Sequence, residues 1–156
     1  VADLGVVAAS QATHATSDMN LAEARNGAHR LKGGDAWRRH LDSGAVLANG
    51  SDFPVELPNP FHGLYAAVTR QDRDGQPESG WYSDQALTRA EALHSFTLAA
   101  AFAAHQEDRL GSLEPGKWAD FIVVDRDLFE VATSEIDDIR VLQTWVGGKL
   151  VYSLTE

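Results

Sequence analysis

Asp52 is the residue of this sequence that is best placed to do chemistry. It follows an apolar run that ends at Gly50, in the stretch VLANGSDFPVELPNPF, and this pattern predicts a strand that delivers one carboxylate to a surface site. An aspartate at the carboxyl end of a parallel strand points into the crevice in which α/β folds bind ligands. A carboxylate there can ligate a metal and carry a proton. An ordinary Asx turn before Phe53-Pro54 is the alternative, and the residues alone favour neither.

Histidine is the second residue type that bears on a metal or substrate site. None of the six histidines is spaced as His-x-His or His-Glu-x-x-His, so no complete metal-site motif is present. His14, in QATHATSDM, lies just beyond a predicted first strand, where a loop residue can reach a pocket. It is as consistent with lining a site as with an ordinary surface position. His94 and His105 are interpreted as surface or packing residues of a helix.

Other motifs and the composition exclude several classes of function. The chain has no phosphate loop, no Gly-x-Ser-x-Gly elbow and no Gly-x-Gly-x-x-Gly fingerprint, which disfavours nucleotide binding and serine hydrolysis. It has no cysteine, hence no disulfide, thiolate metal site or thiol nucleophile. Trp81 and Tyr82 are candidates for a substrate wall, although core packing is favoured.

Charge and hydropathy argue against two kinds of partner. A net charge of -10 over 156 residues disfavours a nucleic acid or an anionic membrane surface, because both call for clustered Lys and Arg. The longest apolar run, Leu98 to Ala104, is too short to cross a bilayer. We therefore expect a cytoplasmic protein that binds neither nucleic acid nor membrane.

The elements that position these residues alternate between strand and helix along the first two thirds of the chain. Strands are predicted at Leu4 to Ala9 and Ala45 to Asn49, and helices at Asp35 to Ser43 and from Pro60 onward. Thr88 and Glu91 fit a capping box for an alanine-rich helix that runs to about His105.

The last part of the chain contains strand patterns only. A strand is predicted through Phe121 to Val124, followed by a hairpin of Val141 to Val146 and Lys149 to Leu154 around Gly147-Gly148. The whole order predicts the last units of an α/β layer followed by a small β domain, with the boundary near Arg109 to Pro115.

Three segments resemble the C-terminal part of the amidohydrolase superfamily. They are GSDFPVELPNPFHGLYAAVTRQD, LTRAEALHSFTLAAAFAAHQEDRLGSLEPGKWADFIVVDRDLFE and VLQTWVGGKLVY. The resemblance is to the branch of uncharacterised metal-dependent hydrolases related to N-substituted formamide deformylases. Gly111 to Asp125 is its most specific part, because Gly-x-Leu-x-Pro-Gly-Lys-x-Ala-Asp-Phe is how these proteins leave the last barrel helix. Asp120 within it is expected to be structural.

The resemblance implies a (β/α)8 TIM barrel with a β-sandwich built from both chain ends. Leu4 to Ala9 would be the seventh barrel strand and Ala45 to Asn49 the eighth. Residues 1–110 would then be the C-terminal part of the barrel, and residues 111–156 the C-terminal strands of the composite sandwich domain. A complete barrel needs about 250 residues, so we expect a fragment of a larger fold.

The resemblance also implies a chemistry. Asp52 matches the aspartate after strand eight, which binds the metal and acts as general base, and His14 matches a strand-seven residue more consistent with a substrate contact than with a ligand. The metal of the full-length parent would be a divalent ion, with zinc expected. The other ligands of the family have no counterparts here, and a catalytic zinc needs about three protein ligands. We therefore expect the isolated chain to bind no metal tightly and to be inactive.

The leading hypothesis is the C-terminal portion of a metal-dependent amidohydrolase that cleaves a non-peptide carbon-nitrogen bond of a small amide-type substrate. Its partner would be the missing N-terminal portion or another copy of the chain, because open strand edges are prone to pair. The alternative is a non-catalytic truncated relative that acts as a binding or oligomerisation module.

Overall fold

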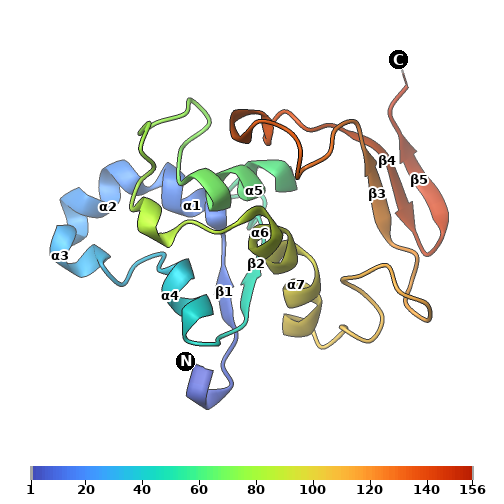
Figure 1. Ribbon diagram of the computed structural model, residues 1–156, viewed down its shortest axis with the longest axis horizontal. Coiled ribbons are helices and arrows are strands. Elements are labelled where there is room, and N and C mark those ends of the chain that lie inside the picture. Colours follow the sequence, from blue (N-terminus) through green and yellow to red (C-terminus); the bar gives the residue numbers. More distant parts are fainter. Residues whose placement is uncertain (1, 156) are drawn as a thin grey trace.

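The computed structural model describes residues 2–155, which form two separate sheets joined by helical segments (Figure 1). The strands are β1 (Ala8–Ser10), β2 (Leu47–Asn49), β3 (Phe121–Val124), β4 (Val141–Val146) and β5 (Lys149–Ser153). The α-helices are α1 (Ala12–Ser17), α2 (Met19–Asn26), α3 (Ala28–Leu31), α4 (Trp37–Asp42), α5 (Pro60–Thr69), α6 (Arg89–Phe96) and α7 (Leu98–Ala103). Short 3-10 turns lie at Ala2–Leu4, Ser83–Gln85 and Thr133–Glu135.

Strands β1 and β2 form a parallel pair at the centre of the helical part (Figure 1). Ala8 lies opposite Leu47 and Ser10 opposite Asn49. A parallel pair requires a crossover between its strands, and the helices α1 to α4 supply it. The carboxyl ends of both strands therefore meet at one edge, where the residues after Ser10 and Asn49 emerge together.

The first strand and the segment after it differ from the sequence prediction. The predicted strand Leu4 to Ala9 is wrong in its bounds, because Gly5 has φ +64 and closes a 3-10 turn by donating to the carbonyl of Ala2, so that β1 begins only at Ala8. The prediction of a loop around His14 is also wrong, because His14 lies in α1, which is followed by α2 and α3. Ala12 and Met19 are buried along the inner side of α1 and α2.

Helix α5 begins where its sequence indicates, whereas its end is not obvious from the sequence. The side chain of Asn59 accepts a hydrogen bond from the Phe61 amide at 3.1 Å, and Pro60 occupies the first turn. The helix stops at Arg70, whose φ of +59 is left-handed. Six of its ten residues are buried, and α5 packs in the core against α1 and α6.

The capping box predicted for Thr88 and Glu91 is confirmed, with both reciprocal hydrogen bonds present. The prediction of one helix from there to His105 is wrong. The chain breaks at Thr97, which has φ -121 and ψ -91 and whose hydroxyl donates to the carbonyl of Leu93 at 2.7 Å. Such back-bonding competes with regular helix geometry, and α7 then ends at Ala103, before His105.

One hydrophobic core joins the helices and the parallel pair. Its largest fully buried apolar side chains are Trp37, Leu47 and Ile136, from α4, β2 and the segment before β4. Gly63 of α5 lies so close to the Phe96 ring that an added Cβ would clash with it. Within residues 2–155, no helix has the length and apolar character needed to span a membrane.

The second sheet has the order β3-β4-β5 and is antiparallel, with β5 at its outer edge (Figure 1). The predicted hairpin around Gly147-Gly148 is confirmed, and both glycines have positive φ, as a tight two-residue turn demands. Phe121 and Trp145 stack across the strands at 5.6 Å between ring centroids. Asp120 is structural, as expected, because its carboxylate accepts a hydrogen bond from the Gly147 amide at 2.6 Å.

Candidate active site

The candidate site lies where β1 and β2 end. The Gly50 amide donates to the Ser10 carbonyl at 3.1 Å, which extends the pairing one residue past the β2 strand. The Ser10 hydroxyl accepts a hydrogen bond from the indole Nε1 of Trp37 at 2.9 Å. On β2, the side-chain amide of the buried Asn49 donates a hydrogen bond to the hydroxyl of Ser95 in α6 at 3.0 Å. Both strand ends are therefore anchored to helices, and the residues after them start from fixed positions.

Asp52 lies two residues beyond Gly50 on an exposed turn, with its side chain 52% accessible. Its φ of +56 is left-handed, a conformation that aspartate tolerates better than most residues. The turn is held by the Ser51 hydroxyl, which accepts from the Phe53 amide at 3.3 Å, and by the Asp52 carbonyl, which accepts from the Val55 amide at 2.8 Å. Ser51 thus fills the role that an Asx turn would give to Asp52, whose carboxylate stays available.

His14 lies in the first turn of α1, and its imidazole reaches the carboxylate of Asp52. Nε2 of His14 is 3.8 Å from Oδ2 of Asp52. This distance is too long for a direct hydrogen bond. Nε2 is buried and has no hydrogen-bond partner among residues 2–155. The parallel pair therefore brings the two candidate residues together, with a polar nitrogen left unsatisfied beside a free carboxylate.

An imidazole nitrogen and a carboxylate are ligand types that zinc accepts. The fit is incomplete, because the described residues contain no cluster of three or more histidine or acidic side chains able to hold a metal ion. The pair can therefore supply part of a divalent-metal or substrate site, and further ligands must come from elsewhere. The structure does not bring the other histidines to this place: His94 and His105 are exposed at the surface, as predicted.

A buried arginine beside the site was missed by the sequence analysis. The Arg70 side chain is fully buried, and burial lowers its pKa to about 10. Its guanidinium lies 4.2 Å from the Trp37 ring centroid and 5.3 Å from that of Trp81. Burial also raises the pKa of the nearby Asp35 carboxyl, an effect that the charge of Arg70 partly offsets. In the sequence, an arginine that ends an apolar helix gives no sign of this role.

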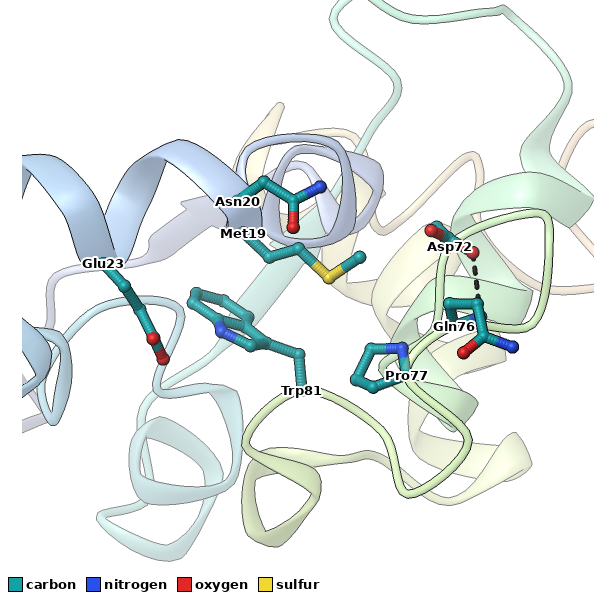
Figure 2. Close-up of a pocket in the computed structure, with 7 residues that line it drawn as sticks. All are labelled: Met19, Asn20, Glu23, Asp72, Gln76, Pro77 and Trp81. Carbon is teal, nitrogen blue, oxygen red and sulfur yellow. Dashed lines mark hydrogen bonds between the residues drawn. The ribbon is translucent and has the colours of Figure 1, made fainter.

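A hollow of about 390 Å³ opens between α2 and the loop of residues 71–81 (Figure 2). It is lined by Met19, Asn20, Glu23, Asp72, Gln76, Pro77 and Trp81. The Trp81 ring is buried, as core packing predicts, and it also lines this hollow. Tyr82 packs edge-on against Trp81 at 4.8 Å, and its hydroxyl donates to Glu23 at 3.2 Å. On the other side of the hollow, the Asp72 carboxylate accepts a hydrogen bond from the backbone amide of Gln76 (Figure 2).

Comparison with known proteins identifies one family. A sequence model of the amidohydrolase family matches residues 1–152. Protein LONG AFTER FAR-RED 3 of Arabidopsis thaliana is 33% identical over 150 residues, which cover 96% of this chain and 25% of that protein. The N-substituted formamide deformylase of Arthrobacter pascens is 36% identical over 118 residues, which cover 76% of this chain and 21% of the enzyme. The chain thus spans a quarter or less of these two relatives.

The comparison with solved structures agrees. An uncharacterized metal-dependent hydrolase from Pyrococcus horikoshii OT3 matches with a TM-score of 0.73 and 33% identity, over 85% of this chain and 27% of that one. A second such hydrolase, from Pyrococcus furiosus, matches with a TM-score of 0.65 and 31% identity, over 80% of this chain and 24% of that one. The resemblance that the sequence motifs indicated is therefore confirmed.

Proposed function

This chain belongs to the amidohydrolase family, and on that premise we propose that it is the C-terminal portion of a metal-dependent hydrolase that cleaves a non-peptide carbon-nitrogen bond. The substrate is a small amide-type molecule, and the parent protein works in the cytoplasm. In this proposal β1 and β2 are the seventh and eighth strands of a (β/α)8 barrel, within residues 1–110. Residues 111–156, with β3 to β5, are part of a composite β-sandwich.

The meeting of His14 and Asp52 at the ends of a parallel strand pair carries this proposal. The 3.8 Å approach of Nε2 to Oδ2 depends on two segments that are remote in sequence. Active sites of α/β barrels lie at the carboxyl ends of their strands, which is where both residues lie. A structural role for Asp52 alone would not require an unsatisfied imidazole nitrogen beside it.

In the proposed reaction Asp52 has two roles. Its carboxylate is one ligand of a divalent metal, zinc in our proposal, and it also carries a proton from the attacking water to the leaving nitrogen. A divalent metal, when bound, polarises the substrate carbonyl and makes water acidic enough to attack near neutral pH. His14 contacts the substrate in this proposal, because its Nε2 lies 3.8 Å from Oδ2 of Asp52.

The isolated chain is inactive in this proposal, since His14 and Asp52 are too few to hold a catalytic metal. The remaining ligands belong to the rest of the parent polypeptide or to another copy of the chain. The open edges of the two-stranded sheet support such an association, because unpaired strand edges are templates for a further strand.

A second candidate function is an association module without catalysis, and the exposed hairpin favours it. Four apolar residues of β4 and β5 are each 45% exposed or more, namely Val146, Leu150, Val151 and Tyr152. Apolar side chains gathered on one sheet mark a surface that another sheet can cover. The same surface is equally required by a composite sandwich, so only catalysis separates the two functions.

The test is Asp52→Asn in the complete parent protein, with formate release from N-butylformamide as the assay. We expect turnover to fall about 100-fold or more, the range in which loss of a positioned proton carrier falls. Asp74→Asn is the matched control, because Asp74 is exposed and outside the site, and it should leave turnover unchanged. Near-normal turnover of Asp52→Asn would reject the catalytic role. A parent that binds no metal and hydrolyses no formamide would favour the association module.

A further inference from the structure

Arg70 is a buried cation that forms no salt bridge with a carboxylate among residues 2–155, although the charges of Asp35 and Asp84 favour its protonated form. Its side chain is fully buried, and Nη2 makes no hydrogen bond within that range. An unpaired buried charge normally destabilises a fold. Departures from the rules of packing are expected where a site needs them, so Arg70 requires an explanation beyond filling the core.

The contacts of Arg70 join three segments on the side of the strand ends. Nε donates to the Trp81 carbonyl at 2.9 Å, and Nη1 donates to the Asp35 carbonyl at 3.2 Å. The guanidinium lies over the Trp37 ring at 4.2 Å from its centroid. The end of α5, the start of α4 and the loop at Trp81 are thus held by one planar group.

The contact with Trp37 leads to the candidate site. Trp37 donates its indole Nε1 hydrogen to the hydroxyl of Ser10 at 2.9 Å. Ser10 is the last residue of β1, and its carbonyl accepts from the Gly50 amide at 3.1 Å. A continuous path therefore runs from Arg70 through Trp37 and Ser10 to the point where the segments of His14 and Asp52 begin.

We propose that Arg70 is a positioning residue, which holds Trp37 and through it the end of β1, and so sets the spacing between His14 and Asp52. This inference rests on the proposed hydrolase function. It explains why arginine occupies the position. A lysine is a point charge on a flexible stem and has no planar group to bond two carbonyls while lying flat on an indole.

The test compares Arg70→Lys with Trp37→Phe in the complete protein, using N-butylformamide. Trp37→Phe retains an aromatic ring beneath the guanidinium and removes the N–H donor to Ser10 together with part of the buried ring. We expect kcat to fall about tenfold or more in each variant with KM changed less than about twofold, because misplaced groups act in the transition state. The double variant should lose no more than the larger single loss, since both act along one path. Arg25→Lys, at an exposed position of α2, is the control and should match the wild type.

A purely structural Arg70 predicts a different outcome. In that case either Arg70→Lys lowers the free energy of unfolding and leaves kcat unchanged, or both substitutions lower kcat and their losses add in the double variant. Either result would overturn the inference.

A second readout, the indole N–H signal of Trp37 in ¹⁵N-labelled protein, does not require activity. Arg70→Lys should shift this signal and speed its hydrogen exchange, while the Trp145 indole, which donates to Gln143, should not change. If the wild-type protein binds no metal and hydrolyses neither formamides nor other small amides, and the Trp37 signal still responds, the proposed function fails and the link from Arg70 to Ser10 stands. If the wild-type protein is active and Arg70→Lys changes neither kcat nor this signal, the inference fails and the function stands.

Discussion

Glu91 should make the stability of this fold depend on pH in acid. Its carboxylate caps α6 by accepting from the Thr88 amide at 2.8 Å and accepts two hydrogen bonds from Arg38 of α4, at 2.7 and 2.5 Å. The Arg38 hydrogen bonds, with those of Thr88, hold the pKa of this carboxyl at about 2 instead of 4.5. Because the folded-state pKa is lowered, the stabilisation is present above pH 4.5 and is lost as the pH falls toward 2.

The magnitude follows from this pKa change and from the exposure of the pair. The change would correspond to about 3 kcal/mol if it were fully realised. The Glu91 side chain is 32% exposed, however, and solvent screening reduces the value to about 1–2 kcal/mol. Glutamine retains the cap and loses the ion pair. Glu91→Gln should therefore lower the free energy of unfolding by about 1 kcal/mol at neutral pH and by only about a quarter of that amount at about pH 2.5.

Urea titration followed by tryptophan fluorescence measures this difference at the two pH values. Glu114→Gln is the control, because Glu114 is exposed and its side chain accepts no hydrogen bond among residues 2–155. A penalty for Glu91→Gln that is the same at both pH values would refute the reasoning, since the ion pair would then contribute nothing that protonation removes.

Three further outcomes follow from particular contacts. Gly63→Ala should lower the free energy of unfolding by about 1–3 kcal/mol because the added Cβ meets the Phe96 ring, whereas Gly33→Ala, with open space around it, should change it by less than about 0.5 kcal/mol in the same urea titration. Burial, and then Arg73, lowers the pKa of His62 below 6.5, so stability should fall as the pH drops below this value, and His62→Gln should flatten that part of the stability curve. A chelator should abolish formamide hydrolysis by the complete parent, and added zinc should restore it.

Local signals predicted the parts of this fold that local forces determine. The capping box of Thr88 and Glu91, the helix begun by Pro60 and the hairpin around Gly147-Gly148 each depend on neighbouring residues alone, and each is present. His14 and Asp52 could be identified from the sequence for a similar reason, because each follows a predicted strand. The contact between these two residues was not predicted, because it depends on the register of two strands that are remote in sequence.

The elements that were missed depend on tertiary context. The helices α1 to α3 bury mainly small side chains such as Ala12 and Ala15, which give a weak hydrophobic period. The break at Thr97 accompanies a hydrogen bond from its hydroxyl to the Leu93 carbonyl, and the sequence does not show whether this hydroxyl bonds the backbone or solvent. The contacts of Arg70 depend on three segments that meet only after folding, and no spacing along the chain encodes that meeting.

The parallel register of β1 and β2 gives this site an uneven tolerance of changes in chain length. His14 lies four residues beyond the end of β1, and Asp52 three residues beyond that of β2, so an insertion in either short stretch would rotate or shift one partner away from the other. The crossover through α2 and α3 is mostly exposed and only has to return the chain to β2. Evolution and engineering can therefore lengthen or tag the exposed part of this crossover, provided that Met19 and Leu31 stay in the core and the two short stretches keep their length.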